Sequence, residues 1–167
     1  MPLRARIFLC ASLAFACLGI EAAESQQGFS YSGFSLGMSR AEANSIHPEV
    51  NWQPAMLIPS EKFLRKEFDG EFLDRTAKVT VDLDPSGNYV RMIGFTFMTS
   101  SDQQCIDDAV RALAKLESQH GEESEVFHEP PGKRAKWAPG NAITVRWGEL
   151  CAAGATRYYI TYAQNGG

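Results

Sequence analysis

Alternation of apolar and polar side chains predicts a β-hairpin near the middle of the chain. In KVTVDLD (78–84) the valines and the leucine face one way, and Thr80 and Asp82 face the other. YVRMIGFTF (89–97) alternates in the same manner. The intervening DPSG is typical of a turn, because proline presets a turn dihedral and glycine accepts a positive φ.

Two more alternating segments predict strands near the end of the chain, AITVRWG (142–148) and TRYYITYA (156–163). One face of this second hairpin must be core. We therefore expect Trp147 and Tyr158 to be buried, and the alternate side chains to point outward.

A capping box predicts a short helix that begins at Ser39. The Ser39 hydroxyl can accept from the backbone of Glu42, whose carboxylate can reach back to the Ser39 amide. Pro48 ends this helix early, because the residue before a proline disfavours helical geometry.

A longer helix is predicted from Ser101 or Asp102 to Gly121. Asp107 and Asp108 lie in its amino-terminal part, the end at which the helix dipole favours acidic residues, and glycine is typical after a last turn. Its apolar stripe consists of Ile106, Ala109, Val110, Leu113 and Leu116.

Two segments are less clearly patterned. SEKFLRKEF (60–68) fits a helix or a strand, and we favour a strand. Residues 122–136 are polar and contain Pro130-Pro131-Gly132, which predicts a mobile loop. The order of elements predicts an α+β fold of two short helix-plus-antiparallel-hairpin units, 34–98 and 101–163, with the helices packed on one face of an antiparallel sheet.

The beginning of the chain has the order of a secretory signal peptide. Arg4 and Arg6 precede an apolar run of about 14 residues, shorter than the roughly 20 of a spanning helix, and small residues follow. We predict a signal peptide over 1–23 and a periplasmic or secreted protein. An uncleaved anchor and a lipid anchor at Cys17 are the alternatives, and no later segment is apolar enough to cross a membrane.

Removal of 1–23 leaves a single predicted domain, 24–167, that is more acidic than the whole chain. The leader carries two basic residues and one acidic residue, so the net charge of −4 becomes −5. An acidic domain lacks the basic face that binding to nucleic acid requires, so we expect no nucleic-acid partner.

The two cysteines that remain after the leader, Cys105 and Cys151, predict a disulfide in an oxidising compartment. It would close a loop of about 47 residues and stabilise the fold by up to roughly 4 kcal/mol. The pair would pin the second helix to the last hairpin.

The residues that could carry chemistry do not form a catalytic or metal-binding pattern. GFSLG (33–37) matches the nucleophile elbow of serine hydrolases, but too few residues precede Ser35 for the core strand that an elbow needs. The histidines share no ligand spacing, and no phosphate-binding glycine loop is present. We therefore predict no enzyme activity, no metal and no cofactor.

FSLGMSRAEA (34–43) followed by VTVDLDPSGNYVRMIGF (79–95) resembles the small outer-membrane assembly lipoproteins of the BamE (SmpA/OmlA-like) family. The resemblance covers 34–97, about half of the mature chain. The chain departs from the family at His47-Pro48, where the family has Gly-x-Pro, and in its second helix-plus-hairpin unit. Membership would imply an accessory factor in outer-membrane assembly or integrity.

The sequence predicts a periplasmic or secreted protein-binding module of the bacterial envelope, with an unknown protein partner. An inhibitor or immunity-type protein would suit an acidic domain that meets a cationic target, and the accessory role above is the alternative. Arginine and aromatic residues dominate protein interfaces. The residues predicted to form the interaction surface are Arg146, Arg157, Tyr159, Trp52 and Trp137.

Overall fold

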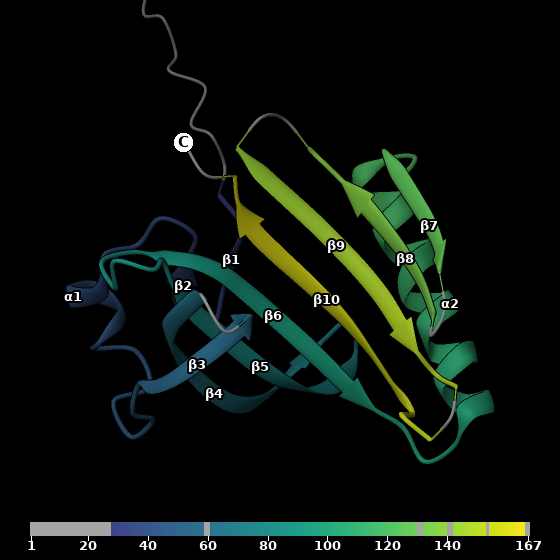
Figure 1. Ribbon diagram of the computed structural model, residues 1–167, viewed down its shortest axis with the longest axis horizontal. Helices are drawn as coiled ribbons and strands as arrows, with labels where there is room; N and C mark the ends of the chain where they lie inside the picture. Colours follow the sequence, from purple (N-terminus) through teal and green to yellow (C-terminus); the bar gives the residue numbers. More distant parts are fainter. Residues whose placement is uncertain (1–27, 59–60, 130–131, 140–141, 153, 166–167) are drawn as a thin grey trace, which may run out of the picture.

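A computed structural model describes residues 28–58, 61–129, 132–139, 142–152 and 154–165 (Figure 1). The predicted signal peptide and Cys17 lie outside these residues. The elements in chain order are β1 (Ser30–Tyr31), β2 (Phe34–Ser35), α1 (Arg40–Ala43), β3 (Gln53–Ile58), β4 (Glu61–Phe72), β5 (Arg75–Leu83), β6 (Val90–Met98), α2 (Asp102–His120), β7 (Glu125–Glu129), β8 (Gly132–Trp137), β9 (Ile143–Leu150) and β10 (Arg157–Gln164).

The fold is built on an antiparallel sheet of eight strands in the order β3-β4-β5-β6-β10-β9-β8-β7. A small two-stranded sheet, β1-β2, accompanies it. Strand accounts for 50% of the structure and helix for 18%, so the protein is mainly β. The predicted α+β class of two helix-plus-hairpin units is therefore wrong, although the predicted hairpins exist within the larger sheet.

The error arose where strands carry unusually polar sequences. The predicted loop 122–136 contains β7 and most of β8, in which Ala135 and Trp137 point inward and charged residues alternate with them. The charged positions hid this alternation. β3 contains Pro54, which is tolerated because β3 is an edge strand. The preference for a strand over 60–68 is confirmed by β4.

The sheet consists of two four-stranded meanders that meet at their last strands. β3 to β6 pair consecutively, and β7 to β10 do the same. β6 and β10 then pair with each other, with Phe95 opposite Ile160. Each of the ranges 34–98 and 101–163 thus supplies one helix and one meander, and the two halves share the seam β6–β10.

The predicted hairpin is confirmed as β5 and β6, joined by the turn at Asp84. The Asp84 carboxylate accepts from the backbone amides of Asn88 and Tyr89 at 2.7 and 2.9 Å. Partial burial opposes ionisation, but these hydrogen bonds and those from Ser86 hold the pKa of Asp84 below its ordinary value. Gly87 takes a φ of +74°, the conformation that the turn requires.

One face of the sheet carries the hydrophobic core, and three elements cover it: α1, α2 and the segment from Phe29 through β2 (Figure 1). Phe29 stacks on Tyr162 with ring centroids 3.6 Å apart, and Tyr31 lies edge-on to Phe95 at 4.8 Å. The strands supply inward residues from both meanders. Trp147 and Tyr158 are buried among them, as predicted.

The capping box at Ser39 and Glu42 is present, and α1 is as short as predicted. Its carboxyl end is held by Lys66 of β4, which is 2% exposed. Lys66 Nζ donates to the carbonyl oxygens of Ile46, His47 and Ala43 at 2.7, 3.1 and 3.4 Å. Burial lowers the pKa of Lys66, and the nearby Glu49 opposes the shift.

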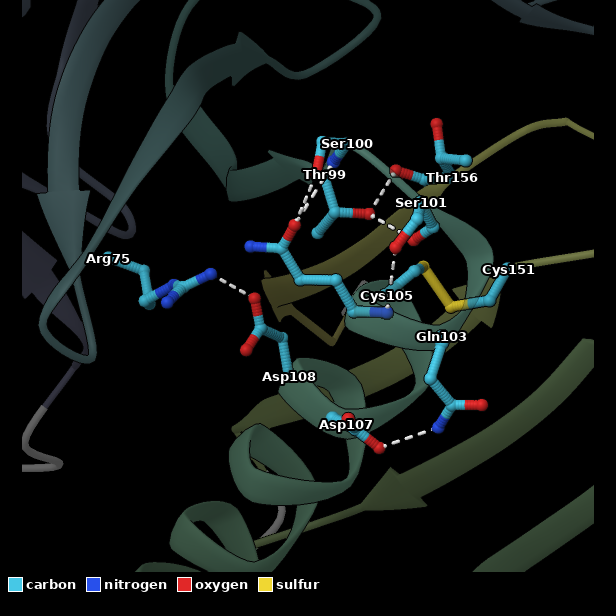
Figure 2. The surroundings of a disulfide bond; sticks show 11 residues. Arg75, Thr99, Ser100, Ser101, Gln103, Cys105, Asp107, Asp108, Cys151 and Thr156 are labelled. Atoms are coloured by element: carbon cyan, nitrogen blue, oxygen red, sulfur yellow. Dashed lines mark hydrogen bonds and ion pairs between the residues drawn. A yellow bond between two sulfur atoms is a disulfide. The ribbon is translucent and has the colours of Figure 1, made fainter.

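The predicted disulfide Cys105–Cys151 is present and joins α2 to the end of β9 (Figure 2). The predicted start and end of α2 are confirmed at Ser101 and Gly121. The prediction of which side of α2 faces the core is wrong in part, because Ile106 and Val110 of the predicted apolar stripe are 41% and 51% exposed.

The residues that α2 turns inward are Cys105, Asp108, Ala109, Ala112 and Leu116. Two tethers, one covalent and one ionic, explain this rotation. The disulfide fixes Cys105, and the buried Asp108 carboxylate accepts from Arg75 (Figure 2) and from Arg111. Adjacent residues on a helix differ in direction by about 100°, so fixing 105 and 108 exposes 106 and 110.

Replacing Lys66 should detach the carboxyl end of α1. Lys66→Met keeps the apolar stem but removes every donor to the three carbonyls, so we expect a loss of about 2–4 kcal/mol in the free energy of unfolding. Urea unfolding measures the loss, and amide hydrogen exchange should show faster exchange in 40–47. The matched variant Lys62→Met, at an exposed position of β4, should have little effect. Equal stability of the two variants would contradict this role for Lys66.

Removing the disulfide should destabilise the fold without changing it. Its 46-residue separation predicts that Cys105→Ala/Cys151→Ala unfolds with up to about 4 kcal/mol less free energy. Urea titration measures this, and reduction of the wild-type protein should cause the same loss. Reductant should leave the variant unaffected. An unchanged unfolding midpoint in the variant would show that the bond does not stabilise the protein.

Candidate functional site

The face of the sheet opposite the core is uncovered by any element within the described part of the chain (Figure 1). The alternation of side chains along each strand shows which residues point to the core and which point to the open face. Where Phe95 and Ile160 point into the core, their neighbours Thr96 and Thr161 point to the open face. Thr80 and Arg146 point to the same open face, because they lie directly opposite Gly94 and Thr161 on the neighbouring strands.

The open face is hollowed at its centre into a cavity of about 670 Å³, which we call the trough. It extends from β4 across the seam to β8 and touches β7. Its lining consists of Arg65, Thr80, Met92, Gly94, Phe95, Thr96, Glu125, Arg134, Ala135, Lys136, Arg146, Trp147, Tyr159 and Thr161.

The trough is deep because two glycines keep its floor low. A Cβ at Gly94 would lie 2.7 Å from Thr80 Oγ1, and a Cβ at Gly148 would lie 2.4 Å from Tyr159 Cζ. The Tyr159 ring therefore lies against the backbone of β9 where any other residue would displace it. Short threonine side chains make the rest of the floor, so a partner could approach the strands closely.

One wall of the trough contains a buried ion pair. Arg65 Nε and Nη2 donate to the two carboxylate oxygens of Asp82 at 2.7 and 2.9 Å. The Asp82 side chain is fully buried, and burial raises its pKa against the opposing effects of Arg65 and Arg91. The guanidinium carbons of Arg65 and Arg91 also lie 5.3 and 5.4 Å from the centroid of the Phe63 ring, at the β4 end of the open face.

The other wall is positively charged, and we call Arg134, Lys136 and Arg146 the basic wall. Lys136 Nζ pairs with Glu125 of β7 at 2.9 Å. Arg134 and Arg146 are exposed and have no ion pair or hydrogen bond within the described residues. The trough thus has a neutralised wall on β4–β5 and a basic wall on β8–β9.

Three of the predicted interaction residues, Arg146, Arg157 and Tyr159, lie on the open face of β9 and β10. Arg146 and Tyr159 line the trough, and Arg157 lies beyond its end. The other two lie elsewhere. Trp137 is 1% exposed and belongs to the core, so it is not available to a partner. Trp52 is half-buried beside α1, and its Nε1 donates to Asn44 Oδ1 at 2.7 Å.

Sequence reasoning missed the contribution of Arg65, Arg134 and Lys136, and the glycine floor. The signal for β8 was present in KRAKW (133–137), where Ala135 and Trp137 alternate with basic residues. The role of Arg65 depends on pairing of β4 with β5, which opposes Arg65 and Asp82 and cannot be read from either segment alone.

The hydroxyl of Ser35, in the elbow-like motif, hydrogen-bonds Ser30 Oγ across β1–β2 at 2.7 Å. A different serine approaches a histidine. Ser32 Oγ lies 3.1 Å from His47 Nε2, and His47 Nδ1 lies 2.9 Å from Glu49 Oε1. This is the order of groups in an activated nucleophile. It lies at an exposed turn outside the trough, and its contacts fasten the β1–β2 turn to the segment after α1.

No group of three or more histidine, cysteine or acidic residues in the described part of the chain is arranged to hold a metal ion. Across the same residues, no helix has the length and apolar character needed to cross a membrane. The chain matches no protein-family model, no curated protein and no solved structure. The BamE-like resemblance therefore stays a prediction, and function is inferred from the site.

Breaking the buried pair on the trough wall should destabilise the protein in a pH-dependent manner. Arg65→Met leaves the Asp82 carboxylate buried without its cation, which should cost about 3–5 kcal/mol at neutral pH. Burial already raises the folded-state pKa of Asp82, and loss of Arg65 should raise it further. The cost is therefore full above the pKa of Asp82 in the variant, and it disappears as pH falls below the folded-state pKa of Asp82 in wild type.

Urea unfolding of Arg65→Met and wild type between pH 7 and pH 3.5 measures this difference. Lys78→Met, which breaks the exposed pair of Lys78 with Asp69, is the matched control and should change the free energy of unfolding little at any pH. A loss in Arg65→Met that does not shrink with acid would show that Asp82 does not titrate in this way.

Proposed function

We propose that this protein is a periplasmic or secreted protein-binding module, and that the trough is the centre of its docking surface. The observation that carries the proposal is the difference between the two sheet faces. One face is covered by two helices and the amino-terminal segment, and the other is open and hollowed. Arginine, tyrosine and methionine, which are enriched in interfaces, line the hollow.

The dimensions of the trough suit a macromolecular partner. From β4 to β8 the sheet has five strand spacings, which is roughly 24 Å at about 4.8 Å each. Met92 to Thr96 along β6 adds roughly 14 Å in the other direction. This footprint is smaller than the roughly 800 Å² that each partner buries in a standard interface. The trough would therefore be the centre of an interface whose rim includes exposed residues such as Arg157 and Glu67.

The disulfide supports an oxidising compartment, because such bonds persist outside the cytoplasm. Together with the leader pattern of 1–23, it supports the proposed periplasmic or secreted location. A sheet stapled in this way presents a surface that changes little on binding, which suits an inhibitor or immunity-type protein. The basic wall alters the expected target, since an acidic rather than a cationic surface would complement the trough.

The outer-membrane accessory role implied by the BamE-like resemblance is the alternative. It predicts that the protein co-purifies with outer-membrane assembly complexes and that deletion sensitises cells to detergent. The trough does not distinguish these partners from a secreted enzyme, because either could supply a protruding protein surface.

Blocking the trough should abolish partner binding. Thr161→Tyr places a bulky, uncharged side chain on the floor while keeping a residue that favours strands. Protein exported by its own leader, purified and immobilised, is used to capture partners from envelope extract. We expect a protein that wild type retains to be lost, at least about tenfold by quantitative mass spectrometry, from Thr161→Tyr.

Val110→Tyr is the matched control, because Val110 is exposed on the outer side of α2. It should retain the partner, and circular dichroism should show that both variants are folded. Equal retention by Thr161→Tyr and wild type, or the absence of any specific partner, would refute the trough as a docking surface.

A further inference from the structure

The basic wall contains positive charge that the fold does not neutralise. Lys136 is paired with Glu125, whereas Arg134 and Arg146 have no anionic partner in the part of the chain that the structure describes. On the opposite half of the open face, Arg65 pairs with Asp82 and Lys78 pairs with Asp69. The excess charge is therefore local to β8 and β9, although the chain as a whole is acidic.

The strand register gathers these two arginines around Tyr159. Arg134 lies opposite Gly148, and Gly148 lies opposite Tyr159 on the next strand. Arg146 is the diagonal neighbour of both Arg134 and Tyr159, a separation of roughly 7–8 Å between backbone positions. Because Gly148 has no side chain, the Tyr159 ring lies over the backbone of β9, beside the two arginines. We call Arg134, Arg146 and Tyr159 the arginine–tyrosine cluster.

The chemistry of this cluster fits a carboxylate. A guanidinium presents a planar fork of donors that matches a carboxylate with two hydrogen bonds, and a tyrosine ring offers a flat apolar surface for the neighbouring part of the ligand. Two like charges on neighbouring strands are mutually repulsive without a counterion. A bound carboxylate would remove that repulsion as well as form the hydrogen bonds.

The rest of the trough indicates that the carboxylate belongs to a protein. A phosphate or lipid headgroup could fill the cluster, but it would leave the threonine and glycine floor and Met92 without contacts. A protruding loop would fill both, because its backbone could reach the floor at Gly94 while an acidic side chain reaches the cluster. The trough measures roughly 24 Å across the strands, which is broad enough for such a loop, since even a helix with its side chains is about 10–12 Å across.

We propose that the arginine–tyrosine cluster receives a carboxylate from a protruding acidic loop of the partner, with Arg134 and Arg146 forming the charged hydrogen bonds and Tyr159 packing against the stem of the loop. This inference rests on the proposed docking role of the trough. It adds the chemistry of the partner and the point on the trough at which its acidic side chain binds.

A cyclic peptide with two aspartates in its turn is the probe, compared with the same peptide carrying asparagines. Binding is followed at millimolar peptide through the arginine Nε–Hε signals of isotope-labelled protein. We expect the signals of Arg134 and Arg146 to shift with the aspartate peptide, which should bind at least about tenfold more tightly than the asparagine peptide. Arg134→Gln/Arg146→Gln should remove this preference, and Tyr159→Ala should weaken binding of both peptides.

Arg40→Gln/Lys62→Gln is the matched control, because it removes the same charge at exposed positions outside the trough lining. It should keep the preference for the aspartate peptide. Inorganic phosphate and phosphatidylglycerol vesicles are tested in parallel. No shift with the aspartate peptide, equal binding of the asparagine peptide, or shifts with vesicles alone would overturn the inference.

The same variants separate this inference from the docking proposal. If Thr161→Tyr abolishes capture of the partner and Arg134→Gln/Arg146→Gln does not weaken it, the trough is the docking surface and the carboxylate inference fails. If Thr161→Tyr leaves capture unchanged, the docking proposal itself fails.

Discussion

The structure depends on the pairing of β6 with β10. Each half of the chain forms a four-stranded meander, and these two strands are the only partners that the meanders exchange in the described sheet. The pairing aligns Ile93, Phe95 and Phe97 with Tyr162, Ile160 and Tyr158, so the two hydrophobic faces become one core. It also places Gly94 beside Thr161 on the opposite face, so the same register that closes the core forms the floor of the trough.

The helices are held to the core face by polar and covalent tethers rather than by apolar packing alone. Lys66 holds the end of α1 through three carbonyls, and α2 is fixed by the disulfide and by the buried Asp108. Lys115 of α2 also pairs with Asp74 in the turn between β4 and β5 at 2.7 Å, which ties the second helix to the first half. With its covering elements attached in this way, the sheet can leave its other face open without losing its core.

The elements with a clean pattern could be predicted from the sequence, and the sheet that contains them could not. The β5–β6 hairpin, the Ser39 capping box, both ends of α2 and the disulfide follow from local spacing. β8 was missed because Arg134 and Lys136 obscured a real alternation, and the rotation of α2 was wrong because Cys105 and Asp108, rather than Ile106 and Val110, had partners. Of the candidate site, Arg146 and Tyr159 could be identified as outward-facing. Their position beside Arg134 depends on pairing between strands, which no local pattern contains.

The glycines of the trough are explained by space rather than by backbone conformation. Gly94 lies in a central strand with negative φ outside the left-handed region, and so does Gly148. Neither position therefore needs the conformational freedom of glycine. What these positions do need is space, because a Cβ would strike Thr80 or Tyr159. The two glycines thus let Thr80 and Tyr159 lie close against the neighbouring strands, and this packing keeps the centre of the open face low.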